Sequence, residues 1–208
     1  MRLLLIRHGD NDSLHQGILP GRLPGVHLNE NGRKEAGKTA ELLRGVALAA
    51  IYASPLERTL ETAQIVAEGH EIKVREEAAF IENYLPEWEG KKFSELAELV
   101  EWKKFCADPI SGGNERAESA KQVQERAVAV VERMRGVYGE KDNVVVVSHG
   151  DVIRGVICHY LNLPLTEMRK LSIETASVSV IALEKETSRV DSVNCTAGLD
   201  WLAEKEAD

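Results

Sequence analysis

Two short runs of consecutive apolar residues constrain the fold of this chain more than any other feature. One covers Leu3–Ile6 at the N-terminus and the other covers Val144–Val147, and neither alternates with polar residues. Such runs are typical of strands that are covered on both faces, as in a parallel sheet. We predict further strands over Ala49–Ala53, Ser177–Leu183 and Val190–Cys195, the last two as a hairpin at the edge of the sheet.

Helical patterns separate the predicted strands. The helix that follows Ala49–Ala53 is expected to begin with Ser54 as N-cap, Pro55 in the first turn and Glu57 as capping-box residue. Gly45 is expected to end the preceding helix. Alternating strands and helices predict an α/β fold, here a three-layer αβα sandwich with a mostly parallel central sheet. The predicted helices are Asn31–Arg44, Pro55–Ala67, Phe93–Phe105, Ala117–Arg135 and Asp151–Leu161.

The length of 208 residues fits one domain with its own hydrophobic core. We therefore predict a single domain over residues 1–208. The stretch 80–118 interrupts the alternation of strands and helices, and we interpret it as a helical and loop insertion, or lid, over the C-terminal ends of the strands. The residues that break regular structure there are Pro86, Pro109, Gly112 and Gly113.

Charge and composition argue against several classes of partner. The formal net charge is −8, which disfavours nucleic acid and anionic membranes. No apolar stretch approaches the roughly 20 residues that span a bilayer, and the first apolar run is too short for an export signal. Three scattered cysteines, Cys106, Cys158 and Cys195, form neither a disulfide framework nor a zinc site. We expect a cytoplasmic protein.

Polar residues follow the predicted strands at the point where each strand ends. Arg7 and His8 come directly after the first apolar run, and His149 comes just after the second. Arg58 lies in the first turn of a helix after a third strand, where free amide groups and the helix dipole favour an anion. Ligands bind beyond the carboxyl ends of strands in open α/β sheets. The sequence therefore predicts a phosphoryl-binding pocket there.

Each of these residues alone has a simpler interpretation. A histidine after a strand is commonly a hydrogen-bonded structural group. Arg58 is spaced to pair with Glu57 or Glu61 on a helix surface. Only the joint placement at three strand ends favours a shared site.

Four segments, spread across nearly the whole chain, form a recognisable set. They are Leu-Ile-Arg7-His8-Gly9, then Ser54-Pro55-Leu56-Glu57-Arg58-Thr59, then Phe80-Ile81-Glu82 with Trp88-Glu89-Gly90, and finally Ser148-His149-Gly150-Asp151. In content and order these segments resemble the motifs of the histidine phosphatase superfamily, which is also called phosphoglycerate-mutase-like, and in particular its phosphatase branch.

The resemblance implies a role for each matching residue. His8 would attack phosphorus and become phosphohistidine, and Glu82 would protonate the leaving oxygen and then deprotonate water. Arg7, Arg58 and His149 would hold the phosphoryl oxygens. Other implied contacts are Asn11 and Gly150 with phosphate, and Arg22, Glu118 and Ser119 with the rest of the substrate.

Elementary chemistry agrees with these roles. Imidazole is a nucleophile only when neutral, and two nearby guanidinium groups disfavour its protonated form. Arginines and a cationic His149 would take the place of a metal ion, so no cofactor is expected. A carboxyl group in a partly dry pocket keeps a proton near neutral pH. Spacing alone does not choose Glu82 over Glu87 or Glu89.

Some positions depart from the family pattern. Leu14 stands where an asparagine is common, and Pro86 where a glycine is common. Asn114–Ala117 separates the Gly-Gly pair from Glu118, where the family has no such residues. Arg116 is a second arginine that could reach an anionic substrate. Specificity therefore does not follow from the resemblance, and a sugar phosphate, a nucleotide or a phosphoprotein would all suit the core.

Three rival functions stay open. The first is a mutase of the phosphoglycerate type, although such mutases usually carry longer insertions than this chain. The second is a non-catalytic module that binds phosphorylated ligands. The third is a metal-dependent phosphatase that uses His8, Asp10, Asp12 and Asp151, although alternating acids in a loop are more commonly turn residues. A homodimer through edge pairing of Ser177–Leu183 is also open.

Overall fold

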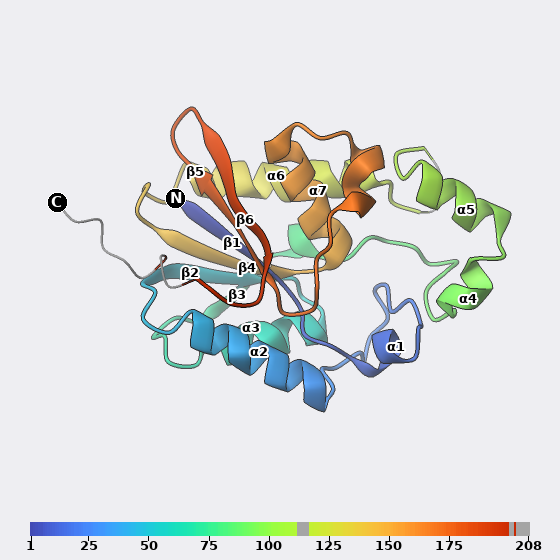
Figure 1. Ribbon diagram of the computed structural model, residues 1–208, viewed down its shortest axis with the longest axis horizontal. Coiled ribbons are helices and arrows are strands. Elements are labelled where there is room, and N and C mark those ends of the chain that lie inside the picture. The colour runs from blue at the N-terminus through green and yellow to red at the C-terminus, as the bar shows by residue number, and fades with distance from the viewer. Residues whose placement is uncertain (112–116, 200–201, 203–208) are drawn as a thin grey trace.

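A computed structural model describes residues 1–111, 117–199 and 202. Its centre is a six-stranded sheet in the order β3-β2-β4-β1-β5-β6 (Figure 1). The first four strands in that order are parallel, and β5 and β6 form an antiparallel hairpin at one edge. The strands are β1 (Arg2–Arg7), β2 (Leu48–Ala53), β3 (Val74–Glu76), β4 (Asn143–Ser148), β5 (Val178–Leu183) and β6 (Ser188–Cys195). The predicted α/β class and its mostly parallel sheet are confirmed.

Helices cover both faces of this sheet, as the uninterrupted apolar runs predict (Figure 1). Leu3 and Leu5 of β1 pack in a core with α6 and α7, whereas Leu4 and Ile6 pack in a second core on the α2 and α3 side. Successive strand side chains point to opposite faces, so a strand buried on both faces is mainly apolar and does not alternate with polar residues. The covering helices are α2 (Glu30–Leu42), α3 (Glu57–Ala67), α6 (Ala120–Arg135) and α7 (Gly150–Leu161).

The insertion lies beyond the C-terminal ends of the parallel strands, close to α1 (Figure 1). Its helices pack on an aromatic cluster that contains Trp88, Trp102 and Phe105. Leu96 is buried in the same cluster. The short elements of this region and its surroundings are α1 (Asp12–His15), η1 (Ala78–Phe80), α4 (Phe93–Leu96), α5 (Val100–Ala107) and η2 (Leu165–Lys170).

The prediction of one helix over Phe93–Phe105 is wrong, because the chain forms α4 and α5 with a break between them. Leu96 and Phe105 are nine residues apart, so a continuous helix would turn them to roughly opposite faces. Both side chains are buried in one aromatic cluster, and the break allows this.

Two further expectations are corrected. Helix α3 begins at Glu57 with Leu56 as N-cap and no side-chain cap, so the predicted capping box at Ser54 does not form. Strand β5 lies between β1 and β6, so Ser177–Leu183 is not an edge and offers no path to a dimer. The free edges of the sheet belong to β3 and β6.

No helix within the described residues has both the length and the apolar character that crossing a membrane requires.

Candidate active site

Three strand ends bring the predicted polar residues together. β1 ends at Arg7 and pairs there with Ser148, the last residue of β4, so His8 and His149 follow adjacent parallel strands. Their ring centroids are 5.3 Å apart. Arg58 projects from the first turn of α3 and is fully buried beside His149. The site predicted at this edge of the sheet is therefore a single cluster.

The hydrogen bond of His8 leaves one ring nitrogen free to react. Its Nδ1 lies 2.8 Å from the carbonyl oxygen of Gly9. A carbonyl only accepts hydrogen bonds, so Nδ1 carries the proton and Nε2 keeps its lone pair. The side chain is 2% exposed. Burial, and next the charges of Arg58 and Arg7, hold the pKa of His8 well below its ordinary value, so the ring is neutral at neutral pH.

His149 has the opposite tautomer. Its Nδ1 lies 3.2 Å from Nη2 of Arg58, which only donates, so Nδ1 accepts and Nε2 donates to the hydroxyl of Ser54 at 2.8 Å. Burial, and next the charge of Arg58, lower the pKa of His149 well below its ordinary value. The contacts and the lowered pKa together favour a neutral His149 ring in this geometry. The bond to His149 also explains why Ser54 does not cap α3.

Buried nitrogen donors of Arg7, Arg58 and Asn11 have no partner among the described residues. They are Nε of Arg7, Nε and Nη1 of Arg58, and Nδ2 of Asn11. Another atom of the same guanidinium or amide group is held by a hydrogen bond in each case. Nη1 of Arg7 donates to Ile173 at 2.7 Å, Nη2 of Arg58 donates to Gly21 at 2.8 Å, and Oδ1 of Asn11 accepts from Leu14 at 3.0 Å.

A buried donor without a partner costs roughly 1–3 kcal/mol. A fold that keeps several such donors in one place is built to receive acceptors. A tetrahedral oxyanion supplies several oxygen acceptors at once, and its charge suits the two guanidinium groups. The arrangement therefore suits a phosphoryl group in its charge and in the hydrogen-bond acceptors that it offers.

Glu82 stands next to this cluster, with Oε2 at 3.8 Å from Nδ1 of His149. Its Oε1 accepts from the backbone of Asn83 at 2.8 Å, and the side chain is 18% exposed. Burial raises the pKa of Glu82 to about 6, and the charge of Asp151 adds to the rise while Arg58 opposes it. Glu89 instead holds the backbone of Arg22 at 2.9 Å. Geometry therefore favours Glu82 as the acid.

Of the three predicted substrate contacts, Arg22 lies beside Glu82 and donates to its carbonyl at 2.7 Å. Arg22 binds Glu118 at 2.8 Å, and Ser119 is the N-cap of α6, where its hydroxyl accepts from Gln122. Gly150 is the first residue of α7, and a Cβ there would lie 3.6 Å from Nε of Arg7. The expectations for Gly112, Gly113 and residues 114–116, including Arg116, fall outside the described residues.

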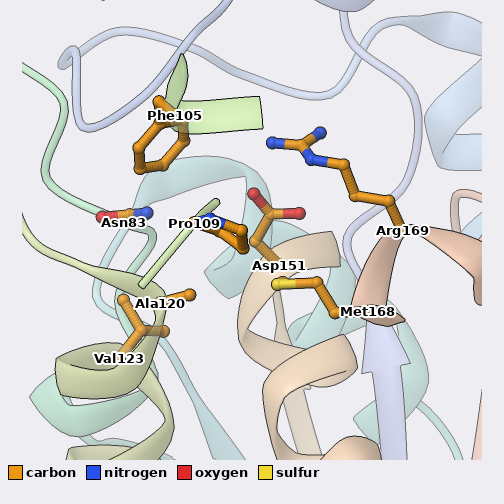
Figure 2. Close-up of a pocket in the computed structure, with 8 residues that line it drawn as sticks. All are labelled: Asn83, Phe105, Pro109, Ala120, Val123, Asp151, Met168 and Arg169. Carbon is orange, nitrogen blue, oxygen red and sulfur yellow. The ribbon is translucent and has the colours of Figure 1, made fainter. Parts of the chain in front are cut away.

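A pocket adjoins the same region, and no sequence pattern predicted it. Asn83 lines it directly after Glu82, and Asp151 lines it from the first turn of α7. Figure 2 shows the carboxylate of Asp151 and the guanidinium of Arg169 turned toward each other across it. Arg169 belongs to η2, which no sequence signal indicated. The other lining residues are Phe105, Pro109, Ala120, Val123 and Met168.

Asp10, in the loop after His8, is occupied by hydrogen bonds from neighbouring asparagines. Asp10 accepts from the backbone of Asn11 at 2.8 Å and from the side chain of Asn29 at 3.1 Å. Across residues 1–111, 117–199 and 202, no group of three or more His, Cys, Asp or Glu side chains is arranged to hold a metal ion. This geometry gives the metal-dependent alternative no set of ligands.

Comparison with known proteins agrees with this geometry. The sequence model of the histidine phosphatase superfamily (branch 1) matches residues 3–196. The chain belongs to this superfamily. Its relatives in the superfamily include both mutases and phosphatases.

Three of the relatives illustrate this. A 2,3-bisphosphoglycerate-dependent phosphoglycerate mutase of Thermoplasma acidophilum is 32% identical over 184 residues, which cover 87% of this chain and 86% of the relative. Phosphoserine phosphatase 1 of Hydrogenobacter thermophilus is 30% identical over 201 residues, which cover 96% of this chain and 94% of the relative. The solved structure of Bacillus stearothermophilus YhfR superposes with a TM-score of 0.85 at 30% identity and covers 91% of this chain and 95% of that one.

Proposed function

We propose that this protein hydrolyses small phosphate monoesters through a phosphohistidine on His8, without a metal ion. The observation that carries the proposal is a neutral His8 whose Nε2 keeps its lone pair, near buried donors that have no partner in the described part of the chain. A nucleophile and an oxyanion site in one place are what covalent phosphoryl transfer requires.

The reaction has two steps. In the first, Nε2 of His8 attacks phosphorus, the bond from phosphorus to the ester oxygen breaks, and Glu82 gives its proton to that leaving oxygen. In the second, a water oxygen attacks phosphorus while the Glu82 carboxylate takes the water proton. The nitrogen–phosphorus bond then breaks, inorganic phosphate leaves, and both side chains return to their starting protonation states.

Arg7, Arg58 and Asn11 supply the donors for the phosphoryl oxygens. Charge spreads over three equatorial oxygens in the transition state, and fixed donors stabilise it without reorganising. His149 adds a group whose protonation the bound anion itself favours, because a nearby negative charge raises the pKa of an imidazole. Gly150 lies at the N-terminus of α7, where free amides and the helix dipole also favour an anion.

The choice of hydrolysis over phosphate transfer rests on Glu82. Its side chain is 18% exposed, so solvent water reaches the group that would activate it. Chain length does not decide the question, because the mutase relative is covered over 86% of its length. A non-catalytic binding module has no need for a free Nε2 on His8 or for a carboxyl group whose pKa is raised toward neutrality.

The raised pKa of Glu82 also supports an acid-type phosphatase. The acid must carry its proton, so turnover of esters with poor leaving groups is expected to fall as the pH rises above about 6. His8 stays neutral well below pH 6.5, so it does not limit activity in the mildly acidic range.

Location and assembly belong to the same proposal. The three cysteines of the chain are free thiols, which supports a reducing compartment such as the cytoplasm. A homodimer, if one forms by strand pairing, would use β3 or β6, the two free edges of the sheet.

The test is a screen for inorganic phosphate release. Wild-type and His8→Ala proteins are given p-nitrophenyl phosphate, sugar phosphates, nucleotides and phosphorylated amino acids, with and without a chelator. We expect release by the wild type only, unchanged by the chelator. Conversion of 3- to 2-phosphoglycerate without release would support the mutase instead, and release by His8→Ala would refute the proposed nucleophile.

A further inference from the structure

Three charged side chains, Arg22, Glu118 and Arg126, form a cluster next to the backbone of Glu82. The carboxylate of Glu118 lies between two guanidinium groups, with Oε2 at 2.8 Å from Arg22 and Oε1 at 2.7 Å from Arg126. Both arginines also donate to the peptide carbonyl of Glu82, Arg22 from Nε at 2.7 Å and Arg126 from Nη2 at 3.3 Å. The same two cations thus hold one carboxylate and one carbonyl.

The cluster is largely removed from solvent. The side chains of Arg22, Glu118 and Arg126 are 26%, 17% and 20% exposed. Partial burial strengthens charge-assisted hydrogen bonds and limits screening by salt. These contacts therefore restrict the backbone more than pairs on an open surface would.

Further bonds extend this hold to either side of Glu82. Arg126 also donates to the carbonyl of Ala79, three residues before Glu82. The backbone of Glu118 donates to the carbonyl of Tyr84 at 2.9 Å, two residues after it. Ile81 still donates to Ala78 at the end of η1, but residues 82–84 belong to no helix or strand. The position of this segment therefore depends on side chains from α6 and from the loop that contains Arg22.

We propose that Arg126 and Glu118 are positioning residues that hold the acid Glu82 at the leaving oxygen. The inference rests on the proposed function, in which Glu82 is the proton donor. It also reassigns Glu118, because both carboxylate oxygens already accept hydrogen bonds, Oε1 from Arg126 and Oε2 from Arg22, Arg126 and the backbone of Tyr84. No sequence pattern predicted a role for Arg126, because it has the pattern of an ordinary polar residue on a surface helix.

The readout is a comparison of two leaving groups. A simple alkyl phosphate needs a proton on its leaving oxygen, whereas p-nitrophenolate leaves without one. kcat/KM reports only the steps up to transfer of the phosphoryl group to His8, so it isolates proton donation from the later attack by water. If Glu82 is displaced, kcat/KM should therefore fall for the alkyl phosphate. The kcat/KM for p-nitrophenyl phosphate should stay unchanged.

The variants are Arg126→Met and Arg126→Lys, with Arg135→Met as matched control. Arg135 lies at the other end of α6, is 18% exposed, and likewise pairs with a carboxylate (Glu132) and donates to two carbonyls, of Glu184 and Thr187. We expect Arg126→Met to lower kcat/KM for the alkyl phosphate by about tenfold or more, a part of the 10²–10⁴-fold that general acid catalysis supplies. Arg126→Lys should recover part of that loss.

Inhibition by vanadate, which tests the oxyanion site alone, should be unchanged in Arg126→Met. An equal fall for both substrates, an unchanged alkyl rate, or the same pattern in Arg135→Met would overturn the inference. Where Arg126→Met fails to fold, as judged by circular dichroism, Glu118→Gln is read by the same criteria. A wild-type protein that releases phosphate from no ester would refute the proposed function instead, so the two failures are distinguishable.

Discussion

Replacing Glu82 with glutamine removes a carboxyl group that the fold holds in an unfavourable place for its charge. The side chain is 18% exposed, and the negative charge of Asp151 lies nearby on α7. The charges that oppose this effect come from Arg58 on α3 and Arg7 at the end of β1. The net result is a pKa of about 6, compared with an ordinary value of 4.5.

The size and sign of the effect on stability follow from this difference. A rise from 4.5 to about 6, at 1.36 kcal/mol per pH unit, corresponds to about 2 kcal/mol. The folded state binds the proton of Glu82 more tightly than the unfolded state does. The resulting stabilisation of the folded state is fully present below pH 4.5 and is lost as the pH rises through about 6. Glutamine carries no charge at any pH, so it avoids this loss of stability. Glu82→Gln should therefore raise the free energy of unfolding by about 1–2 kcal/mol at pH 8, the lower end allowing for partial solvent screening.

The assay is urea-induced unfolding of wild type and Glu82→Gln at pH 4 and pH 8, with activity toward an alkyl phosphate measured in parallel. The variant should match the wild type in stability at pH 4, exceed it at pH 8, and lose activity. A variant that is less stable than the wild type at pH 8, or a stability difference that is the same at both pH values, would refute the electrostatic reasoning. Full activity in the variant would refute the catalytic assignment.

Three other predictions test different parts of the site. For an alkyl phosphate, kcat/KM should fall about tenfold per pH unit above about pH 6, where Glu82 loses its proton, and p-nitrophenyl phosphate should lack this limb; matching profiles would contradict the assignment. Arg58→Met should lower kcat/KM by about 10²–10³-fold and weaken inhibition by vanadate, whereas unchanged vanadate affinity would exclude Arg58 from the oxyanion site. Gly32→Ala should lower the free energy of unfolding by about 1–3 kcal/mol, because its Cβ would lie 2.0 Å from the carbonyl oxygen of Asp10. Gly37→Ala in the same helix meets no atom within 4 Å and should raise that free energy by up to about 1 kcal/mol, so equal shifts in urea unfolding would contradict the packing argument.

The parts of the fold that sequence predicts best are those that local pattern decides. The uninterrupted apolar runs indicate β1 and β4, because a strand covered on both faces buries apolar side chains at successive positions. His8 and His149 follow these strands directly, so the site that they share was predictable from the parallel arrangement alone.

The parts that sequence predicts poorly depend on partners far along the chain. Ser54 has the pattern of an N-cap, yet its hydroxyl binds His149, 95 residues away. Leu96 and Phe105 share one cluster only because the helix between them is broken. Arg126 reads as a surface residue until Glu118 and the Glu82 carbonyl are placed beside it. No local pattern contains these contacts, so no local pattern could reveal them.

The central claim is that Nε2 of His8 becomes bonded to phosphorus during turnover. Its most direct test is to mix enzyme with a fast substrate such as p-nitrophenyl phosphate, quench in alkali within one turnover, and map the phosphorylated peptide by mass spectrometry. Our account predicts a phosphoryl group on His8. Nε2 should carry it, because Nδ1 donates a hydrogen bond to the carbonyl oxygen of Gly9. A phosphoryl group on any other residue, or phosphate release with no covalent intermediate at any time, would contradict it.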